Sequence, residues 1–222
     1  MKIAQRLKRQ LRMLRRRFFS DPKKFVKTDE TSGQLQFELL KKEGCMPTSR
    51  VLEIGCGFLQ AGAPLMQYLE KGCYVGIDPN GWLIKKAMKR PGIRQLVEEK
   101  QGRFLHVSDF DASTLGVTFD RVLSHSVLSH AAHWQLEQFL RNTSRVLAPG
   151  GRIVASIRLA EGNNFGSAGS PDRQDSMDEE WVYPGVSWFK LATVIATADR
   201  LGLHAVHVPE HTEFYTLSLI HI

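Results

Sequence analysis

The stretch Val51-Leu52-Glu53-Ile54-Gly55-Cys56-Gly57 decides the fold of this 222-residue chain. A short apolar strand runs directly into two glycines that are separated by one residue. Glycine permits a tight turn and lets a ligand approach the backbone closely. In an open α/β sheet, ligands bind at the carboxyl ends of the strands, which is where this turn would lie. The stretch therefore predicts a ligand-binding turn after the first strand of a sheet.

Outward from this turn, strands and helices alternate through most of the chain. Short connections between them favour a parallel sheet that is covered by helices on both faces. We expect an α/β fold with a doubly wound, mostly parallel seven-stranded sheet, whose last strand is an antiparallel edge strand. The domain is expected over residues 31–222, behind a basic segment over residues 1–30. The expected strands span residues 50–54, 73–77, 104–107, 119–124, 152–157, 203–208 and 214–220, and the expected helices span 34–43, a stretch ending near 69, 82–89, 94–100, 134–147 and 187–201.

Carboxylates follow the next two strands. Asp78 ends the second strand, and its carboxylate can accept both hydroxyl protons of a ribose. Asp109 follows the third strand and offers an oxygen to an adenine amino group, while Phe110 offers an aromatic face to the base. A Leu-Ala-Pro-Gly-Gly turn at residues 147–151 precedes the fifth strand. Together these positions predict that a nucleoside binds at the carboxyl edge of the sheet.

A dinucleotide-dependent dehydrogenase is the main alternative, because its glycine turn looks similar. The dinucleotide pattern Gly-x-Gly-x-x-Gly leaves room for a pyrophosphate, and counted from Gly55 its third glycine would fall on Gln60. The acidic residue after the third strand and the Pro-Gly-Gly turn have no counterpart in dinucleotide sites. The pattern therefore favours a different nucleoside cofactor.

In four motifs, VLEIGCG, GID, SDF and LAPGG, the chain resembles the class I S-adenosylmethionine (SAM) dependent methyltransferases from about residue 50 to residue 157. The resemblance implies SAM as the cofactor and a Rossmann-like fold. It implies that the glycine turn holds the methionine portion of SAM and that Glu53 orients the turn and the SAM amino group. It further implies that Asp78 holds the ribose and Asp109 the adenine amino group. The residues implied to bind the cofactor are Glu53, Gly55, Cys56, Gly57, Asp78, Pro79, Asp109, Phe110 and Ser124.

The glycine motif departs from the family pattern at one position. The family commonly has a third glycine two residues after the second, where this chain has Leu59. The next glycine is Gly62, three residues further on. We interpret this longer Gly-Phe-Leu-Gln-Ala-Gly form as a subfamily variant.

Two histidines after the fourth strand are candidates for a general base. Methyl transfer mainly requires the enzyme to align the acceptor and exclude water, but an oxygen acceptor benefits from a base near neutral pKa. His125 and His130 lie in the loop that meets cofactor and acceptor in the family, and His130 is preferred. The alternative is that both are hydrogen-bonded packing residues. A metal site with His133 is disfavoured, because spacings of five and three do not place three imidazoles on one helical face.

Residues 158–186 interrupt the alternation with a long Gly-, Ser- and Asp-rich stretch. Long loops in compact domains are often lids or binding loops. We expect this one to recognise the acceptor, with Trp181 and Tyr183 stacking on a sugar or another ring. Equally, the two aromatic residues could only pin the loop to the body of the domain.

The positive charge of the chain is concentrated at its N-terminus. Residues 1–27 contain eleven Lys or Arg and one acid, so they carry +10, while the whole chain carries +7. Residues 2–19 are predicted to form a basic amphipathic helix with an apolar stripe. This arm is expected to contact an anionic membrane surface or to pack on the protein itself, and contact with RNA phosphates is the less favoured reading.

Composition is typical of a cytoplasmic enzyme. There is no run of eighteen apolar residues and no secretory signal, and the three cysteines lack metal-ligand spacing. We expect a cytoplasmic protein, with peripheral attachment to the inner membrane surface if the arm binds lipid. Residues 217–222 are similar to a translated transposon-end sequencing adapter. If they come from such an adapter, the natural protein has a different last strand. The alternative is that these residues form a real edge strand.

The resemblance places the chain among bacterial methyltransferases for surface polysaccharides or other small molecules. The reaction expected is O-methylation of a small molecule or glycan. An RNA methyltransferase guided by the basic arm, and a SAM-binding protein without catalysis, are the alternatives.

Overall fold

The computed structural model describes residues 30–161, 164–167, 185–208 and 215–221. The predicted basic helix over residues 2–19 and the aromatic residues Trp181 and Tyr183 lie outside the described residues. The helices are α2 Glu30–Lys42, α3 Gly62–Tyr68, α4 Gly81–Ala87, α5 Ile93–Lys100, α6 His133–Arg145 and α7 Leu191–Arg200, with short 3₁₀ turns η2 Ser113–Leu115 and η3 Leu128–His130. The strands are β1 Val51–Ile54, β2 Tyr74–Ile77, β3 Arg103–Leu105, β4 Phe119–Ser124, β5 Leu147–Ile157, β6 Asn164–Ser167, β7 Gly185–Trp188, β8 Leu203–Val208 and β9 Tyr215–His221.

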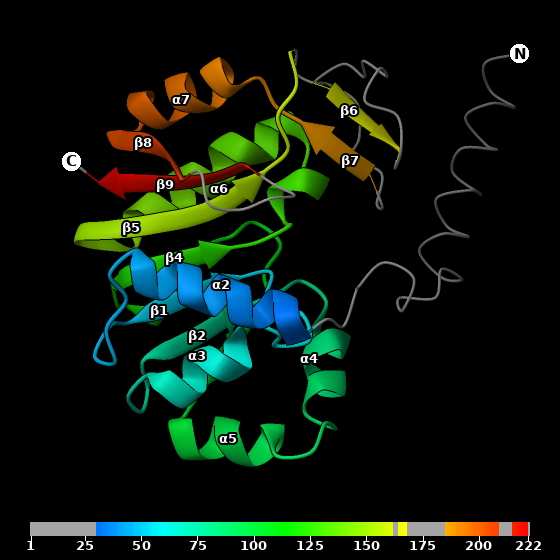
Figure 1. The fold of residues 1–222 in the computed structure, drawn as a ribbon, viewed down its shortest axis with the longest axis vertical. Coiled ribbons are helices and arrows are strands. Elements are labelled where there is room, and N and C mark those ends of the chain that lie inside the picture. The colour runs from blue at the N-terminus through cyan, green and yellow to red at the C-terminus, as the bar shows by residue number, and fades with distance from the viewer. Residues whose placement is uncertain (1–29, 162–163, 168–184, 209–214, 222) are drawn as a thin grey trace, which may run out of the picture.

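Seven strands form one sheet in the order β3-β2-β1-β4-β5-β9-β8 (Figure 1). The five strands from β3 to β5 are parallel, and β9 runs antiparallel to both of its neighbours. The predicted α/β fold with a mostly parallel seven-stranded sheet and an antiparallel last strand is therefore confirmed.

Each face of the sheet carries its own hydrophobic core, because side chains alternate along the strands. On β1, Leu52 and Ile54 belong to the core that packs α6 and α7, whereas Val51 belongs to the core that packs α2, α3, α4 and α5. Helix α6 accordingly lies behind the sheet in Figure 1, and α2 lies in front of it. Two cores on opposite faces are what a doubly wound sheet requires.

The structure corrects the predicted position of the last strand. β9 lies inside the sheet between β5 and β8, not at its edge, and it pairs with β5 from Arg152↔Ile220 to Ile157↔Tyr215. β8 and β9 are close in sequence, which predicts that they pair with each other. It does not predict the pairing of β9 with β5. Residues 217–221, which resemble the adapter translation, form part of β9.

The predicted turn at residues 149–151 is a bulge within β5. The register steps from Phe119↔Leu147 to Arg121↔Arg152. β5 therefore contains three more residues than β4 between these two pairs. Gly150 has φ +70, which glycine adopts without strain. The turn residues thus bend a continuous strand and do not end one.

The segment expected to be a loop over residues 158–186 contains regular structure. β6 and β7 pair antiparallel from Asn164↔Trp188 to Ser167↔Gly185 (Figure 1). Ser187 and Trp188 were expected in the last helix but belong to β7, and α7 begins at Leu191. An alternating pattern this short, broken by glycines, is difficult to distinguish from a loop in sequence.

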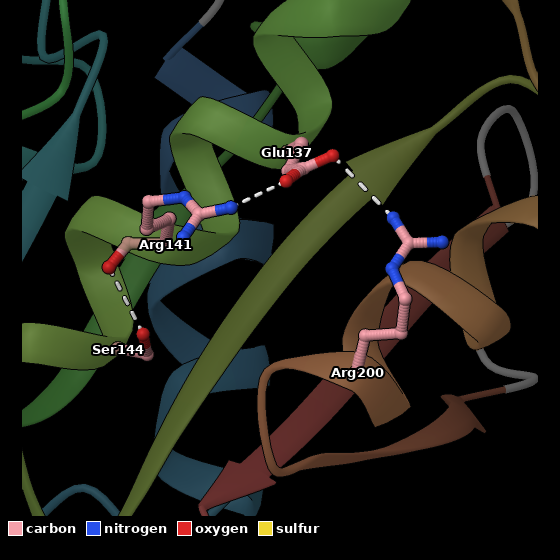
Figure 2. A network of polar contacts seen from close by, with 4 residues as sticks. All are labelled: Glu137, Arg141, Ser144 and Arg200. Atoms are coloured by element: carbon pink, nitrogen blue, oxygen red, sulfur yellow. Dashed lines mark hydrogen bonds and ion pairs between the residues drawn. The ribbon is translucent and has the colours of Figure 1, made fainter.

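Side-chain contacts fasten the outer helices to the sheet. The Arg121 guanidinium donates to the carbonyls of Glu43 and Gly44 at 2.8 and 2.7 Å, at the C-terminal end of α2. Glu137 on α6 accepts from Arg141 and from Arg200 at the end of α7, as Figure 2 shows. These last three side chains are 44 to 63% exposed, so their ion pairs contribute little to stability.

Candidate cofactor and active site

The turn after β1 has the backbone conformation that its glycines predict. Gly55 and Gly57 have φ of +75 and +44. The Gly55 N–H donates to the carbonyl of Ile77 at 2.8 Å, which ties the turn to the end of β2. Leu59 also has a positive φ of +58 and is fully buried. A non-glycine residue in this region costs roughly 1–2 kcal/mol, so burial of the Leu59 side chain must offset that cost.

Helices α2 and α4 hold the remainder of this loop. A Cβ on Gly33 of α2 would lie 2.1 Å from the Gln60 carbonyl oxygen, so α2 and the loop touch backbone to backbone. From the other side, Trp82 of α4 contacts Phe58 edge-on, with ring centroids 6.1 Å apart. The loop is therefore fixed in place on both flanks.

Asp78 joins the end of β2 to the glycine turn. Its Oδ2 accepts the Gly57 N–H at 3.0 Å, and its Oδ1 accepts the Asn80 N–H at 2.7 Å. A carboxylate has about four lone-pair sites, so about two remain, which matches the two hydroxyls of a ribose. Burial raises the pKa of Asp78 above its usual range. Pro79, the next predicted cofactor residue, is exposed beside it.

Glu53 and Cys56 lie beneath the turn. Glu53 is buried, its Oε2 accepts a hydrogen bond from the Tyr74 hydroxyl at 2.5 Å, and burial raises its pKa to about 8. Cys56 is buried against β2, where its Sγ would lie 2.8 Å from a Cβ on Gly76. Burial raises the pKa of the Cys56 thiol as well, so it is an inert packing group.

In the loop after β3, Asp109 is exposed whereas Phe110 is buried. Asp109 is exposed, its Oδ1 accepts the Asp111 N–H at 3.2 Å, and its carbonyl accepts from Asn142 of α6. Phe110 has φ +64 and packs edge-on against Phe139 in the core, 5.5 Å between ring centroids. The Asp109 carboxylate is thus at the surface, and its predicted contact with adenine stays a prediction, as does that of Phe110.

A histidine that the motifs did not signal stands next to Asp78. His106 Nδ1 lies 3.4 Å from the Asp78 carbonyl oxygen. A Cβ on Gly81 would lie 2.8 Å from the His106 ring, so Gly81 is a glycine where this ring needs space. That glycine, three residues after Asp78, is the one sequence signal of this contact.

The loop after β4 carries an unsatisfied polar group. The Ser124 hydroxyl is buried and has no hydrogen-bond partner among the described residues. Ser126 has φ +59, and its N–H donates to Ser156 Oγ at 2.8 Å, which links the ends of β4 and β5. Buried hydroxyls are normally paired, so Ser124 has capacity for a ligand. His125 and His130, the candidate bases, are half-buried in the same loop.

His133 anchors the β6–β7 hairpin. Its Nε2 lies 3.2 Å from the Trp188 carbonyl oxygen, and its ring packs on Phe189 at 5.0 Å. The Ser187 hydroxyl donates to the Ala131 carbonyl next to it. Across the described ranges, no group of three or more metal-binding side chains occurs. The hairpin is thus attached directly to the loop that carries the candidate bases.

Comparison with known families and structures identifies the chain. The sequence model of the methyltransferase domain matches residues 52–153, which contain the four motifs except for Val51. A magnesium protoporphyrin IX methyltransferase from Synechocystis PCC 6803, crystallised with bound SAM, has a TM-score of 0.60 and 14% identity, covering 88% of this chain and 80% of its own. Residues 52–153 thus carry a methyltransferase domain, and the chain has the fold of SAM-dependent methyltransferases.

Other methyltransferases show how wide the set of similar structures is. A glycopeptide N-methyltransferase has a TM-score of 0.64 at 12% identity, covering 86% of this chain and 90% of its own. Among curated proteins, a tRNA U34 carboxymethyltransferase from Idiomarina loihiensis is 26% identical over 164 residues. That match covers 73% of this chain, which spans about half, 47%, of the relative's length.

In this methyltransferase, Leu59 stands at the departure from the family motif and has a φ of +58, in the left-handed region that glycine usually occupies. Gly62 serves a different purpose, because a Cβ there would lie 2.4 Å from the Tyr74 hydroxyl.

No helix of the part that the structure describes is long and apolar enough to span a membrane.

Proposed function

We propose that this methyltransferase uses SAM to methylate an oxygen of a small molecule or glycan. The observation that carries the cofactor assignment is the hydrogen bond from the Gly57 N–H to Asp78 Oδ2, 3.0 Å long. It brings the glycine turn and the ribose-binding acid together at the carboxyl edge of the sheet, where ligands of α/β sheets bind. A dehydrogenase is disfavoured, because Gln60 stands where the dinucleotide pattern requires a third glycine.

The residues present fit SAM. Asp78 retains acceptor sites for the ribose hydroxyls, and the exposed Asp109 carboxylate can receive the adenine amino group. The backbone of the turn from Gly55 to Gly57 would face the methionine portion, with Ser124 below it. When bound, SAM supplies a methyl group that its sulfonium already activates. The chain itself must then position the acceptor and exclude water.

The acceptor would lie against the loop after β4. A histidine there can take the proton of an acceptor hydroxyl as the oxygen becomes methylated. We propose His130, and His125 as the second candidate, because both are half-buried in the segment that follows β4. Alanine at each position tests this: full methyl transfer by both variants would remove the proposed base.

The β6–β7 hairpin and residues 158–186 would shape the acceptor side. The contacts of His133 and Ser187 attach the hairpin to the loop after β4. Trp181 and Tyr183 are proposed to stack on the acceptor, and they lie outside the described residues. Deletion of residues 163–176 should reduce acceptor turnover more than SAM affinity, and the opposite result would reject this role.

RNA is the second candidate acceptor. It is favoured by the tRNA-modifying relative and by the +10 charge of residues 1–27. An anionic membrane is the competing partner for this arm. Flotation with anionic vesicles and a labelled-RNA binding assay, each on the full chain and on a chain lacking residues 1–20, separate the two partners. The basic arm has neither role if the truncation changes neither result.

The acceptor itself can be found directly. Bacterial extract is incubated with the protein and SAM carrying an isotopically labelled methyl group, and the products are identified by mass spectrometry. A labelled O-methyl product supports the proposal, and labelled RNA supports the second candidate. If no product carries label although SAM binds, the chain is a SAM-binding protein without catalysis.

A further inference from the structure

Tyr74 and Glu53 form a buried pair beneath the glycine turn. The Tyr74 hydroxyl donates to Glu53 Oε2 at 2.5 Å, and the two side chains are 1% and 5% exposed. They stand on neighbouring strands, since β1 and β2 pair in parallel register. Hydrogen bonds to a charged acceptor are the stronger ones in proteins. The pair is therefore a fixed element of the floor of the site.

The sequence makes room for this pair at the start of α3. A Cβ on Gly62 would lie 2.4 Å from the Tyr74 hydroxyl and 3.0 Å from Glu53 Oε2. The unusual spacing of the third glycine thus has a structural reason: Gly62 is required where Tyr74 reaches under the helix.

Only one oxygen of Glu53 is used by Tyr74. Among the described residues, Oε1 has no hydrogen-bond partner. A carboxylate held by one oxygen in a fixed orientation can present the other to a cationic group. In the proposed cofactor, the cationic group beside this turn is the ammonium of the methionine portion.

We propose that Tyr74 is a positioning residue that orients Glu53 for binding the cofactor ammonium. This inference rests on the proposed cofactor and deepens it. The hydroxyl of Tyr74 acts only through Glu53, so its removal should affect ligands that carry the amino acid portion and spare ligands that lack it.

The surroundings of Glu53 make this hydrogen bond important. Burial and the nearby Asp78 carboxylate raise the pKa of Glu53, whereas the hydrogen bond from Tyr74 lowers it. The titratable groups around it are Tyr74 on β2, Asp78 directly after β2 and Cys56 in the turn. α3 presents no charged side chain there, as its sequence is GAPLMQY. Tyr74 is thus the group among these that favours the carboxylate form.

Two ligands separate positioning from a general structural role. S-adenosylhomocysteine (SAH) carries the amino acid portion, whereas 5′-methylthioadenosine has the same adenosine and sulfur without it. We expect Tyr74→Phe to weaken SAH binding about tenfold at pH 7, because a charged hydrogen bond is lost, and to leave methylthioadenosine binding unchanged. The pH at which SAH affinity rises should also move upward.

Matched variants complete the experiment. Tyr68→Phe also removes a hydrogen-bonded hydroxyl, which donates to the Cys45 carbonyl at 3.2 Å, and it should alter neither affinity. Glu53→Gln keeps the shape but removes the charge, so it should weaken SAH alone and abolish the pH dependence. Equal loss of both ligands in Tyr74→Phe, or no loss of SAH, would overturn the inference. A wild-type chain that binds neither ligand would overturn the proposed cofactor instead.

Discussion

Gly55 and Val127 lie so close that a Cβ on residue 55 would be 2.3 Å from Val127 Cγ2. The turn after β1 and the loop after β4 are therefore in direct contact. In the proposed function, this contact would bring the cofactor side and the acceptor side of the site next to each other. It also means that residue 55 must be glycine for steric reasons as well as for its φ of +75.

Gly55→Ala should therefore lose SAH binding and lower the free energy of unfolding by about 2–4 kcal/mol, from strained backbone and overpacking. Gly92→Ala is the matched control, because Gly92 has φ +74 but nothing within 4 Å of its Cβ position. It should cost about 1–2 kcal/mol and leave SAH affinity intact. Calorimetry and urea unfolding measure both. Equal effects of the two variants would contradict the proposed role of the Val127 contact.

Asp78→Asn should weaken binding of SAH and of methylthioadenosine together by tenfold or more, because both ligands carry the ribose. The loss reflects the missing charge at the ribose hydroxyls. Asp120→Asn serves as control, since Asp120 also accepts a main-chain N–H, from Arg50 at 2.7 Å, at the opposite edge of the sheet. If methylthioadenosine binds Asp78→Asn as tightly as wild type, Asp78 does not hold the ribose.

The stability of the protein should fall as pH rises through the range in which Glu53 ionises. Burial raises the pKa of Glu53 from an ordinary value of 4.5 to about 8 in the folded chain. A raised folded-state pKa gives stability that is present below about 4.5 and is lost as pH rises through about 8. We expect unfolding free energy to drop by a few kcal/mol between pH 5 and 8.5, and to drop less in Glu53→Gln. Identical pH dependence in the two proteins would show that Glu53 ionises normally.

His133→Phe should loosen the β6–β7 hairpin without affecting SAH affinity. The variant keeps a ring against Phe189 but leaves the Trp188 carbonyl without its donor, at a cost of about 1–3 kcal/mol. Amide exchange at Phe189, whose N–H donates to the Arg158 carbonyl, should accelerate about tenfold or more. His204→Phe, on an exposed position of β8, should leave that amide unchanged. Unaltered exchange in His133→Phe would mean that other contacts hold the hairpin.

Much of the parallel part of the sheet could be predicted from local pattern. β4 and β8 have the predicted boundaries, because each is a short apolar run between turn residues. The interior position of β9 could not be predicted, since its pairing with β5 joins residues 58 to 68 positions apart, from Ile157↔Tyr215 to Arg152↔Ile220. The bulge in β5 was missed because Pro-Gly-Gly is equally typical of a turn.

The candidate site follows the same division. Gly55 and Asp78 could be named because strand tips and their spacing are visible in the sequence. The Tyr74–Glu53 pair and the His106–Gly81 contact could not be predicted, because they depend on which side chains face each other across strands and loops. In both cases a glycine marks the space that a neighbouring side chain needs, and this signal can be interpreted only once the neighbour is known.

We propose that the turn at Gly55 and the carboxylate of Asp78 bind SAM together, the turn facing its methionine portion and Asp78 holding its ribose. Isothermal titration of the full chain with SAH and, separately, with NAD tests it most directly. We expect one SAH to bind per chain and NAD to produce no heat of binding. Binding of NAD without binding of SAH would contradict it.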